Sequence, residues 1–519
     1  MRPHPESTRP LVLSLPRSAR TRLPGPLIAV ALAGIALAAP AAARSPAPAP
    51  APSGASSSSQ DTAAPVDAFT ALRDSLAESL VPQLMELAEQ CRAEKLYGTA
   101  DEVKTAVLGL DPYHAAARRA LGYFDRGDEG WVRSRTYRVR RNYGEPETVE
   151  AMQSRIDELM QVARTPLLEL VAITRAERGL SKSWRQLERL GDMFPEDATI
   201  HELLGEERVE DHWELVESVR ARSRRQAYPN LARACLERAP DPVPGEVRPE
   251  ERKLNLQWNS TRRTEDVRVL ATTSDADAVY AARVSHAIGD FVRYALRVDA
   301  QHRDDFTIYM LGLQDRGALL QAWPQLSVST RKALMQADGG WLDAQNRLAQ
   351  WSANPARRID GAARQTFGTM LIDSFGIDGR QAWAWEGLGL YLVHEMVGTR
   401  LTWFFHPEGY APQAPTGLWQ RLQNPEVDWF REAATMLDAP QAPRLVSLLG
   451  RKVNAMREQD VLHAYVFAAY LLEGHPQALP KILKRIGAGE RPAGVLEEEL
   501  GYPMPVVEKR LRRWIDESR

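Results

Sequence analysis

The chain has 519 residues, of which 44% are hydrophobic and 26% are charged, and its formal net charge is −2. This is ordinary globular composition, and the length is too great for one core, so two or three domains are expected. Acidic and basic residues nearly balance, so the chain lacks the excess of positive charge that is typical of proteins that bind nucleic acid or an anionic membrane surface. This argues against both as partners.

The first 43 residues carry the parts of a secretory signal peptide. Arginines at positions 9, 17, 20 and 22 precede an apolar run of 13 residues, Leu27 to Ala39, and residues 41–43 supply an A-x-A cleavage pattern. We expect export to the periplasm, the cell surface or the medium, with a mature chain that begins near Arg44. An uncleaved membrane anchor is the alternative, although 13 residues are short for a span. Residues 44–64, rich in Ala, Pro and Ser, predict a disordered tether.

Residues 65–145 predict a tetratricopeptide-like helical region. Leu87-Ala88 recurs as Leu121-Gly122 after 34 residues, which is the period of a tetratricopeptide helix pair. Asp111-Pro112 predicts a helix end. The apolar positions at helical spacing are Leu84, Leu87, Ala88 and Cys91, followed by Ala100, Val103, Val107 and Leu110.

The only two cysteines, Cys91 and Cys235, each lie within an apolar helical pattern. Buried free thiols are the expected state, and a disulfide between the two is the alternative that an exported protein leaves open.

A second internal sequence similarity predicts two related units, each a helix followed by a tryptophan. Leu121-Gly122 precedes Trp131 and a basic stretch, and Leu204-Gly205 precedes Trp213 and another basic stretch. A long helical segment over 147–193 is expected between them, within a second helical region over 146–238. The two tryptophans either line a peptide-binding groove or pack between helices.

A proline-rich segment over 239–263 predicts a linker and the main domain boundary. Beyond it we expect a strand over 266–271, a helix over 275–296 and a strand over 306–311, then a loop containing Gly339-Gly340 and two helices. A further helix is expected over 460–472. The predicted fold class is mostly helical α+β, with a helical-repeat region followed by a domain with a small mixed sheet.

The sequence from Trp383 to Leu392 has the form W-x-x-E-G-L-x-x-Y-L. It resembles the second zinc-ligand helix of the gluzincin metallopeptidases, in particular the secreted bacterial peptidase MA-like proteins. The resemblance covers residues 264–519 and implies a zincin-like domain. It implies that Glu386 stands at the third zinc ligand and that an H-E-x-x-H helix precedes it by about twenty residues.

That preceding segment lacks the motif. Gln365 and Thr369 stand where the histidines belong, and Thr366 stands where the base belongs. Between Trp351 and Trp385 there is no histidine and no glutamate, so no alignment of this segment restores the site. The resemblance therefore implies a degenerate member with no catalytic residues, in which Glu386 is a vestigial ligand and zinc is not expected as a cofactor.

The remaining candidate residues belong to a groove or to the core. Glu386, Trp383, Tyr391 and Tyr465 are the candidate groove residues. Each has a structural alternative: Glu386 as a carboxylate that caps the start of a helix, and the aromatic rings as packing residues. By resemblance, Tyr465 also stands where a hydroxyl would stabilise an oxyanion.

His394 belongs to a second candidate metal site. An improvised site of Glu386, His394 and His406 would lack a second histidine at helical spacing, so we expect His394 to be exposed or bonded to the backbone.

We predict an exported, non-catalytic pseudo-metallopeptidase that acts as a protein- or peptide-interaction module of the cell envelope. An active metallopeptidase with an atypical zinc site using Glu386, and a purely structural envelope protein, are the alternatives. The identity of the partner is left open, and contact with a membrane is expected only through an uncleaved signal.

Overall fold

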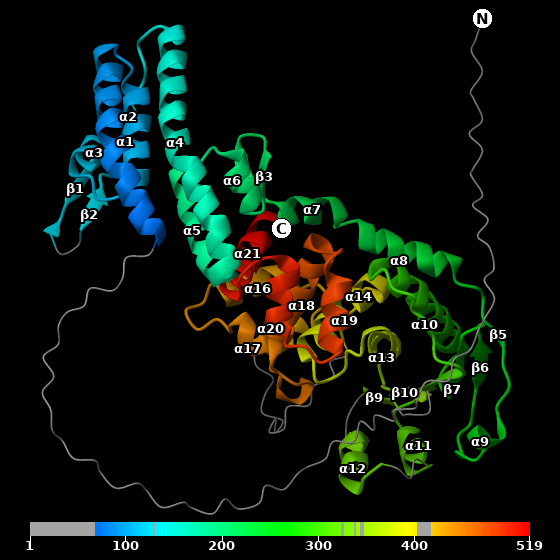
Figure 1. Ribbon diagram of the computed structural model, residues 1–519. Helices are drawn as coiled ribbons and strands as arrows, with labels where there is room; N and C mark the ends of the chain where they lie inside the picture. Colours follow the sequence, from blue (N-terminus) through cyan, green and yellow to red (C-terminus); the bar gives the residue numbers. More distant parts are fainter. Residues whose placement is uncertain are drawn as a thin grey trace, which may run out of the picture. The chain divides into compact units, whose positions relative to one another are not determined.

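The structure is a computed structural model that describes residues 68–127, 130–138, 140–322, 326–336, 339–342, 347–401 and 417–518 (Figure 1). All of these residues belong to one compact unit. The predicted signal peptide, the tether and His406 lie outside the described residues. Within the described ranges, no helix is both long enough and apolar enough to cross a bilayer.

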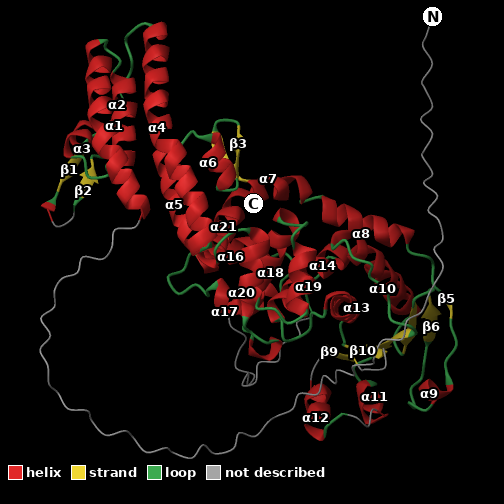
Figure 2. Cartoon of the chain, in the orientation of Figure 1, coloured by secondary structure: helices red, strands yellow, loops and turns green. Residues whose placement is uncertain are grey.

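The predicted fold class is confirmed, because helices dominate and the largest sheet is small and mixed (Figure 2). The chain opens with the helices α1 (Ala68–Ala93) and α2 (Tyr97–Leu110), which pack on each other. The predicted apolar stripes of both helices are buried. Cys91 lies in this core and Cys235 in the core of the C-terminal half, and both are buried free thiols.

Two short helices, each followed by a β-hairpin, form the predicted pair of related units. The first unit is α3 (Ala115–Ala120), β1 (Tyr123–Asp125) and β2 (Trp131–Arg133). The second is α6 (Ala198–Leu203), β3 (Glu206–Val209) and β4 (His212–Leu215). Between them lies the long helical segment that we expected, as two helices, α4 (Pro146–Arg178) and α5 (Leu180–Met193), with the break at Gly179.

The two units correspond at an offset of 83 positions up to Gly122 and Gly205, and at an offset of 82 from Trp131 and Trp213 onward, because the first hairpin turn is one residue longer. Gly122 and Gly205 both enter their hairpin with positive φ, 79° and 71°. The amide that follows each hairpin donates to the carbonyl of that glycine, at 2.9 Å in the first unit and 3.1 Å in the second. Leu87-Ala88 lies inside α1, whereas Leu121-Gly122 lies between α3 and β1, so the two pairs that suggested a 34-residue period stand at different places in their elements.

The tryptophans of the two units are packing residues. The guanidinium of Arg118 lies 5.6 Å from the ring of Trp131, and the ring of His201, at the same position in the second unit, stacks on Trp213 at 4.1 Å. The preceding proline carbonyl also accepts from the equivalent side chain in both units, from Arg118 Nε at 2.6 Å and from a ring nitrogen of His201 at 2.8 Å. Both tryptophans are half-buried and lie against a side chain of their own unit, as the packing alternative predicts.

A six-stranded mixed sheet forms the centre of the C-terminal half, with the strand order β5-β6-β7-β8-β10-β9. The three central strands, β7 (Val267–Ala271), β8 (Phe306–Leu311) and β10 (Arg347–Trp351), run parallel. The antiparallel outer strands are β5 (Val243–Pro244), β6 (Ser260–Arg263) and β9 (Gly339–Leu342).

Both faces of this sheet are covered, as parallel strands require. One set of alternating side chains packs against α10 (Asp275–Ala295) and α13 (Pro355–Phe375). The other set packs against α11 (Arg316–Ala322), α12 (Val328–Gln336) and the residues after α9 (Pro249–Arg252). The strands and the helix predicted between residues 266 and 311 are confirmed to within two residues.

Two segments that we predicted as irregular belong to this sheet. The proline-rich segment 239–263 contributes β5, α9 and β6, so the sheet begins before the predicted boundary at residue 264. Gly339-Gly340 was predicted as a loop, which is wrong, because both glycines pair with β10 in strand β9. There the side chain and backbone of β10 leave no room for a Cβ on Gly340.

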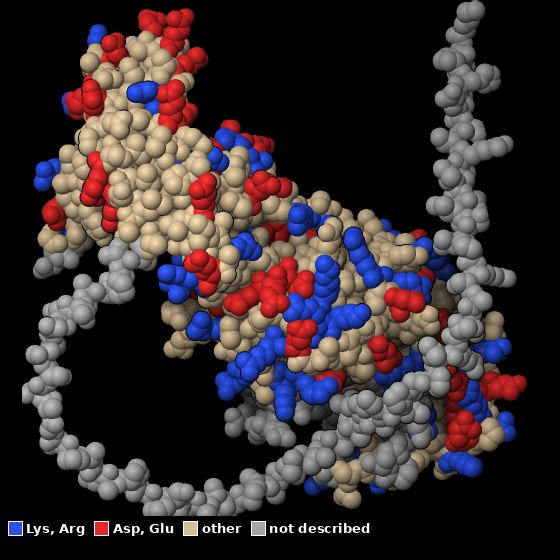
Figure 3. All heavy atoms as spheres, in the orientation of Figure 1, with Lys and Arg blue, Asp and Glu red and all other residues tan. Residues whose placement is uncertain are grey.

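The other helices of the C-terminal half pack around two almost wholly buried ones, α14 (Ala382–Val397) and α18 (Glu458–Gly474). Their neighbours are α7 (Val216–Arg224), α8 (Ala227–Arg238) and, from the end of the chain, α16 (Trp429–Leu437) and α21 (Met504–Ser518). The remaining helices in this half are α15 (Gly417–Leu422), α17 (Leu445–Leu449), α19 (Leu479–Gly487) and α20 (Pro492–Leu500). On the face drawn in Figure 3, basic and acidic side chains are intermixed over these helices.

Candidate functional site

The helices that carry the predicted site residues, α13 and α14, pack side by side in the core. Asn354 caps α13 by accepting from the amide of Ala356, and Gly376 ends it in the left-handed conformation. The helix predicted to start near Glu386 starts four residues earlier, at Ala382. Glu386 therefore lies in the second turn of α14, and its predicted alternative role as a cap of the helix start is wrong.

Glu386 forms a fully buried ion pair with Arg364 of α13. Both side chains are 0% exposed, and Arg364 Nη2 donates to Glu386 Oε2 at 3.2 Å and to the carbonyl oxygen of Trp385 at 2.6 Å. Burial lowers the pKa of Arg364, and the neighbouring Glu386 carboxylate opposes that shift. Since arginine titrates far above neutral pH, Arg364 presents a guanidinium to the side chain of Glu386.

Two glycines make room for this pair. A Cβ on Gly389 of α14 would lie 1.6 Å from Arg364 Nη1, so only glycine admits the guanidinium at that point. On α13, a Cβ on Gly368 would lie 2.5 Å from the outer carbon of the Trp385 ring. The space between the two helices is therefore filled by one guanidinium and one indole.

The residue of α13 that contacts Glu386 is Arg364, which directly precedes Gln365, the residue at the first histidine position of the motif. Successive helical residues point about 100° apart, so Gln365 and Thr369 lie on a different line of α13 from Arg364 and Gly368. All of Gln365, Thr366 and Thr369 are buried.

The side chains at the motif positions serve the helix itself. The hydroxyl of Thr366 donates to the carbonyl of Ala362 at 2.8 Å, and the hydroxyl of Thr369 donates to the carbonyl of Thr366 at 2.7 Å. The Oε1 atom of Gln365 is buried without a donor among the described residues.

These residues do not fit a zinc ion. A catalytic zinc site needs three protein ligands drawn from imidazole, thiolate and carboxylate, and here Glu386 supplies the only such group and already holds a cation. The described residues contain no group of three or more His, Cys, Asp or Glu side chains arranged to hold a metal. If the motif is aligned one residue earlier, Arg364 and Gly368 stand at the histidine positions, and neither side chain is a zinc ligand.

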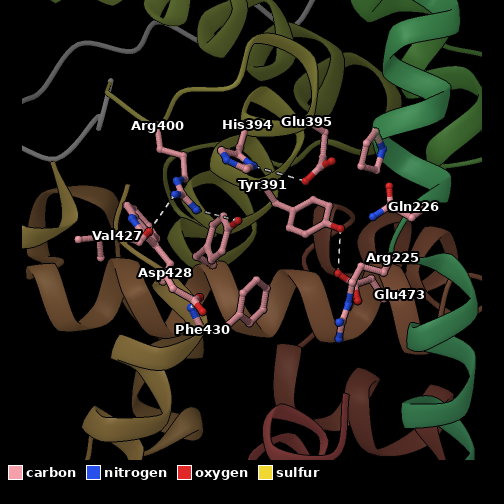
Figure 4. A pocket seen from close by; sticks show the side chains of 13 residues that line it. Arg225, Gln226, Tyr391, His394, Glu395, Arg400, Val427, Asp428, Phe430 and Glu473 are labelled. Atoms are coloured by element: carbon pink, nitrogen blue, oxygen red, sulfur yellow. Dashed lines mark hydrogen bonds and ion pairs between the residues drawn. The ribbon is translucent and has the colours of Figure 1, made fainter. Parts of the chain in front are cut away.

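A cavity of about 340 Å³ opens beside the far half of α14 (Figure 4). It is lined by α14, α18, the junction of α7 and α8, and the first turn of α16. Of the four candidate groove residues, Tyr391 and Tyr465 line it, whereas Glu386 and Trp383 are 0% exposed and do not. The full lining is Arg225, Gln226, Pro229, Tyr391, His394, Glu395, Arg400, Val427, Asp428, Trp429, Phe430, Tyr465 and Glu473.

Both tyrosines are held by charged side chains. The hydroxyl of Tyr391 donates to Glu473 Oε1 at 2.9 Å, and the hydroxyl of Tyr465 accepts from Arg400 Nη1 at 3.1 Å. Burial, followed by the charges of Glu473 and Glu395, raises the pKa of Tyr391 well above its ordinary value. Tyr391 is therefore a neutral hydrogen-bond donor at neutral pH.

His394, which we expected to be exposed or bonded to the backbone, lies at the wall of the same cavity. Its side chain is 34% exposed, and Nδ1 lies 3.5 Å from Glu395 Oε1. Glu386, by contrast, is wholly enclosed between α13 and α14, so the improvised site of Glu386 and His394 has no support among the described residues.

Sequence reasoning missed two arginines that organise the region, Arg364 and Arg400. The signal for Arg364 was present, since it is a lone charge in the run Gly361 to Thr369 of small, apolar and uncharged residues. A charge in such a run needs a buried partner, and Glu386 stands in an equally apolar helix. Arg400 follows the end of α14 and gave no comparable signal.

Comparison with known proteins found no protein-family model that matches this chain and no similar curated protein.

Proposed function

We propose that this chain is an exported, non-catalytic pseudo-metallopeptidase that serves as a protein- or peptide-interaction module of the cell envelope. The observation that carries the proposal is the buried pair of Arg364 and Glu386. In the gluzincin resemblance Glu386 is a zinc ligand, and here its carboxylate is neutralised by a guanidinium from the helix that should carry the other ligands.

The surrounding packing supports the same reading. An ion pair enclosed at 0% exposure is stable only when both charges are present, because loss of either leaves an uncompensated buried charge. Gly389 and Gly368 fit the side chains of Arg364 and Trp385 so closely that a metal with its ligands would have to displace both. The pair of Arg364 and Glu386 thus occupies the place that the resemblance gives to a metal ion.

Two features support peptide binding. Strand β9 is the outermost strand of the sheet and pairs with β10 through one edge, and no described strand pairs with its other edge, where an extended peptide could add. The cavity beside Tyr391 and Tyr465 adds a concave site with several polar side chains, the usual form of a ligand pocket.

Three measurements on purified chain test the proposal together. Metal analysis after dialysis should find no stoichiometric zinc, an assay with casein should find no cleavage above buffer, and capture from native envelope extract should retain a defined partner. Stoichiometric zinc, lost with activity in Glu386→Gln, would establish the active enzyme instead. Absence of any retained partner would favour a purely structural envelope protein.

A further inference from the structure

The first helix-hairpin unit is rich in arginine and in aromatic residues. Residues 113–143 contain eight arginines and six aromatic residues, against three acidic residues. This excess of positive charge is local, because the formal net charge of the whole chain is −2. The unit therefore presents a field of one sign on a chain that is otherwise nearly balanced.

Three of these arginines lie against aromatic rings on one side of the hairpin. Tyr123 pairs with Arg133 across the two strands, and Trp131 shares that face because side chains alternate along a strand. The guanidinium groups of Arg133 and Arg118 lie 5.6 Å and 5.8 Å from the ring of Tyr123, and that of Arg119 lies 5.9 Å from the ring of Trp131. These distances suit cation–π contact. We call these five residues the arginine–aromatic face.

The net charge of this face is positive. Arg119 and Arg133 are exposed, and neither forms an ion pair with another described residue. Asp125 adds one carboxylate at the end of its strand, and Asp101 is buried in an ion pair with Arg140. The face thus has three guanidinium groups against one exposed carboxylate.

The second helix-hairpin unit has the same strand register, so its residues can be matched to this face. The strand positions correspond as follows: Tyr123 to Glu206, Trp131 to Trp213 and Arg133 to Leu215. On the preceding helix, Arg119 stands where the second unit has Glu202. The charge on this side of the unit is therefore reversed between the two copies.

In the second unit all three strand positions hold a neighbouring helix, α21. Glu206 accepts from Arg513 Nη1, and the carbonyl of Trp213 accepts from Arg513 Nη2 at 2.8 Å. The amide of Leu215 donates to Glu517 Oε2 at 3.3 Å. This chain thus uses the face for protein recognition, with a carboxylate on the hairpin and a guanidinium on the partner. The reversed charge of the first unit suits a partner that brings the carboxylates.

The residue types of the face also suit a protein partner. Tyrosine, tryptophan and arginine are the residues enriched in the energetic centres of protein interfaces, and arginine clusters recognise acidic motifs through paired hydrogen bonds to carboxylates. Tyr113, which is 78% exposed and lies 5.5 Å from the guanidinium of Arg118, extends the aromatic surface. The rings of Tyr123 and Trp131 each lie against two guanidinium groups, which leaves less of them for stacking on a base or a sugar ring.

We propose that the arginine–aromatic face binds an acidic segment of a partner protein. Carboxylates of the partner pair with Arg119 and Arg133, and its apolar side chains pack on the rings of Trp131 and Tyr113. The inference rests on the proposed function, since it gives that interaction module a place and a chemistry for its partner.

Fluorescence anisotropy with the purified full chain tests the preference for acidic segments. The probes are two fluorescein-labelled peptides, one with three repeats of E-E-L-A and the other with three repeats of Q-Q-L-A. The acidic peptide should bind at least tenfold more tightly than the neutral one, and its affinity should fall as salt is added, because exposed charges are screened. The comparison uses unaltered protein, so it does not depend on the folding of any variant.

Paired variants locate the binding surface. Arg119→Gln combined with Arg133→Gln should weaken binding of the acidic peptide at least tenfold. Arg175→Gln combined with Arg431→Gln is the matched control, because both arginines are exposed, lie outside the face and remove the same charge. The control should bind as the parent does. Arg119→Glu combined with Arg133→Glu should bind a K-K-L-A peptide more tightly than the parent does, a gain that unfolding cannot produce.

Several results would overturn this inference. They are equal affinity of the parent for the acidic and neutral peptides, an equal loss in the face variant and the control, and no gain in the reversed variant. Alginate or single-stranded DNA that displaced the acidic peptide at a lower concentration of charged groups would assign the face to that polymer instead.

The two proposals can fail separately. If the parent and the face variant retained the same partner from envelope extract, the proposed function would stand and the acidic-partner inference would fall. Stoichiometric zinc with cleavage of casein would overturn the non-catalytic function and leave the peptide result standing.

Discussion

Arg364 gives Glu386 the positive neighbour that a metal ion supplies in the gluzincin resemblance. A guanidinium differs from zinc because it carries its own planar set of hydrogen-bond donors and does not need histidine ligands around it. A single arginine can therefore pair with the carboxylate. Beside that pair, Gln365, Thr366 and Thr369 offer none of the side chains that ligate zinc in proteins, and the two threonine hydroxyls donate to carbonyls of their own helix. The chemistry of the site is decided by these few side chains.

Buried histidines make a separate contribution at the residue scale, through the dependence of stability on pH. Burial lowers the pKa of His302, His463 and His475 from 6.5 to about 4 in each case. Between those values the unfolded chain binds more protons than the folded chain, so the free energy of unfolding falls as the pH falls. Each histidine contributes a slope of up to about 1.4 kcal/mol per pH unit, roughly 4 kcal/mol for the three.

Urea denaturation near pH 7 and near pH 5 measures this slope. His463→Leu should remove about a third of the dependence while keeping the apolar volume of a fully buried position. Equal stability at the two pH values in the parent protein would contradict the assignment of these histidines as buried and neutral.

At the scale of elements, α14 depends on two glycines of its E-G-L-G sequence. A Cβ on Gly387 would lie 2.2 Å from the carbonyl oxygen of Ala464 in α18, and a Cβ on Gly389 would collide with Arg364. Glycine inside a helix costs about 1 kcal/mol relative to alanine, so its presence here reflects close packing and not helix propensity.

We therefore expect Gly387→Ala and Gly389→Ala each to lower the free energy of unfolding by about 1–3 kcal/mol through overpacking. Gly494→Ala is the matched control, because Gly494 lies in helix α20 and a Cβ there meets nothing within 4 Å. That control should be neutral or stabilising by up to about 1 kcal/mol. Chemical denaturation compares the three, and a stable Gly389→Ala would show that Arg364 does not lie against α14.

The elements differ in how far the sequence could reveal them. Strands β7 and β8 have five and six residues, most of them apolar and all of them buried, which matches the short apolar runs that the sequence shows there. Hairpin β1–β2 has strands of three residues, too short for any periodicity, and β9 begins with two glycines that locally favour a turn. The conformation of residues 339–342 as strand β9 therefore depends on pairing with β10 in the folded protein and not on the local sequence.

The site was harder to predict than the fold. The spacing of Glu386 and the missing motif were visible in the sequence, but the register of α13 against α14 is fixed by Gly368 and Gly389, which carry no chemistry of their own. The cavity joins residues from α8, α14, α16 and α18, and no local pattern brings these together.

For the molecule as a whole, the last helix ties the second helix-hairpin unit to the C-terminal core. Arg510 of α21 donates to both carboxylate oxygens of Glu217 at 2.7 Å, to the carbonyl of Leu204 at 2.6 Å and to that of Gly205 at 2.8 Å. Tyr470 of α18 also donates to Glu217, at 3.0 Å. Although burial alone would raise it, the pKa of Glu217 is lowered by Arg510, so the carboxylate is charged.

Arg510→Met should lower the free energy of unfolding by about 3–5 kcal/mol, because it leaves Glu217 buried without its cation. The adjacent Lys509→Met is the control. Its side chain is 75% exposed in a surface pair with Glu188, and surface pairs contribute about 0–1 kcal/mol. If the two variants lost the same stability, the link through α21 would be of no greater importance than a surface contact.

The central claim, that Glu386 is the ion-pair partner of Arg364 and not a metal ligand, is tested most directly by a double-mutant cycle. Unfolding free energies are measured for the parent, Arg364→Met, Glu386→Gln and the double variant in the presence of a chelator. Each single change should cost about 3–5 kcal/mol, and the double variant should lose about 1–3 kcal/mol less than the sum of the two single losses. Additive losses, or a parent protein destabilised by the chelator, would contradict it.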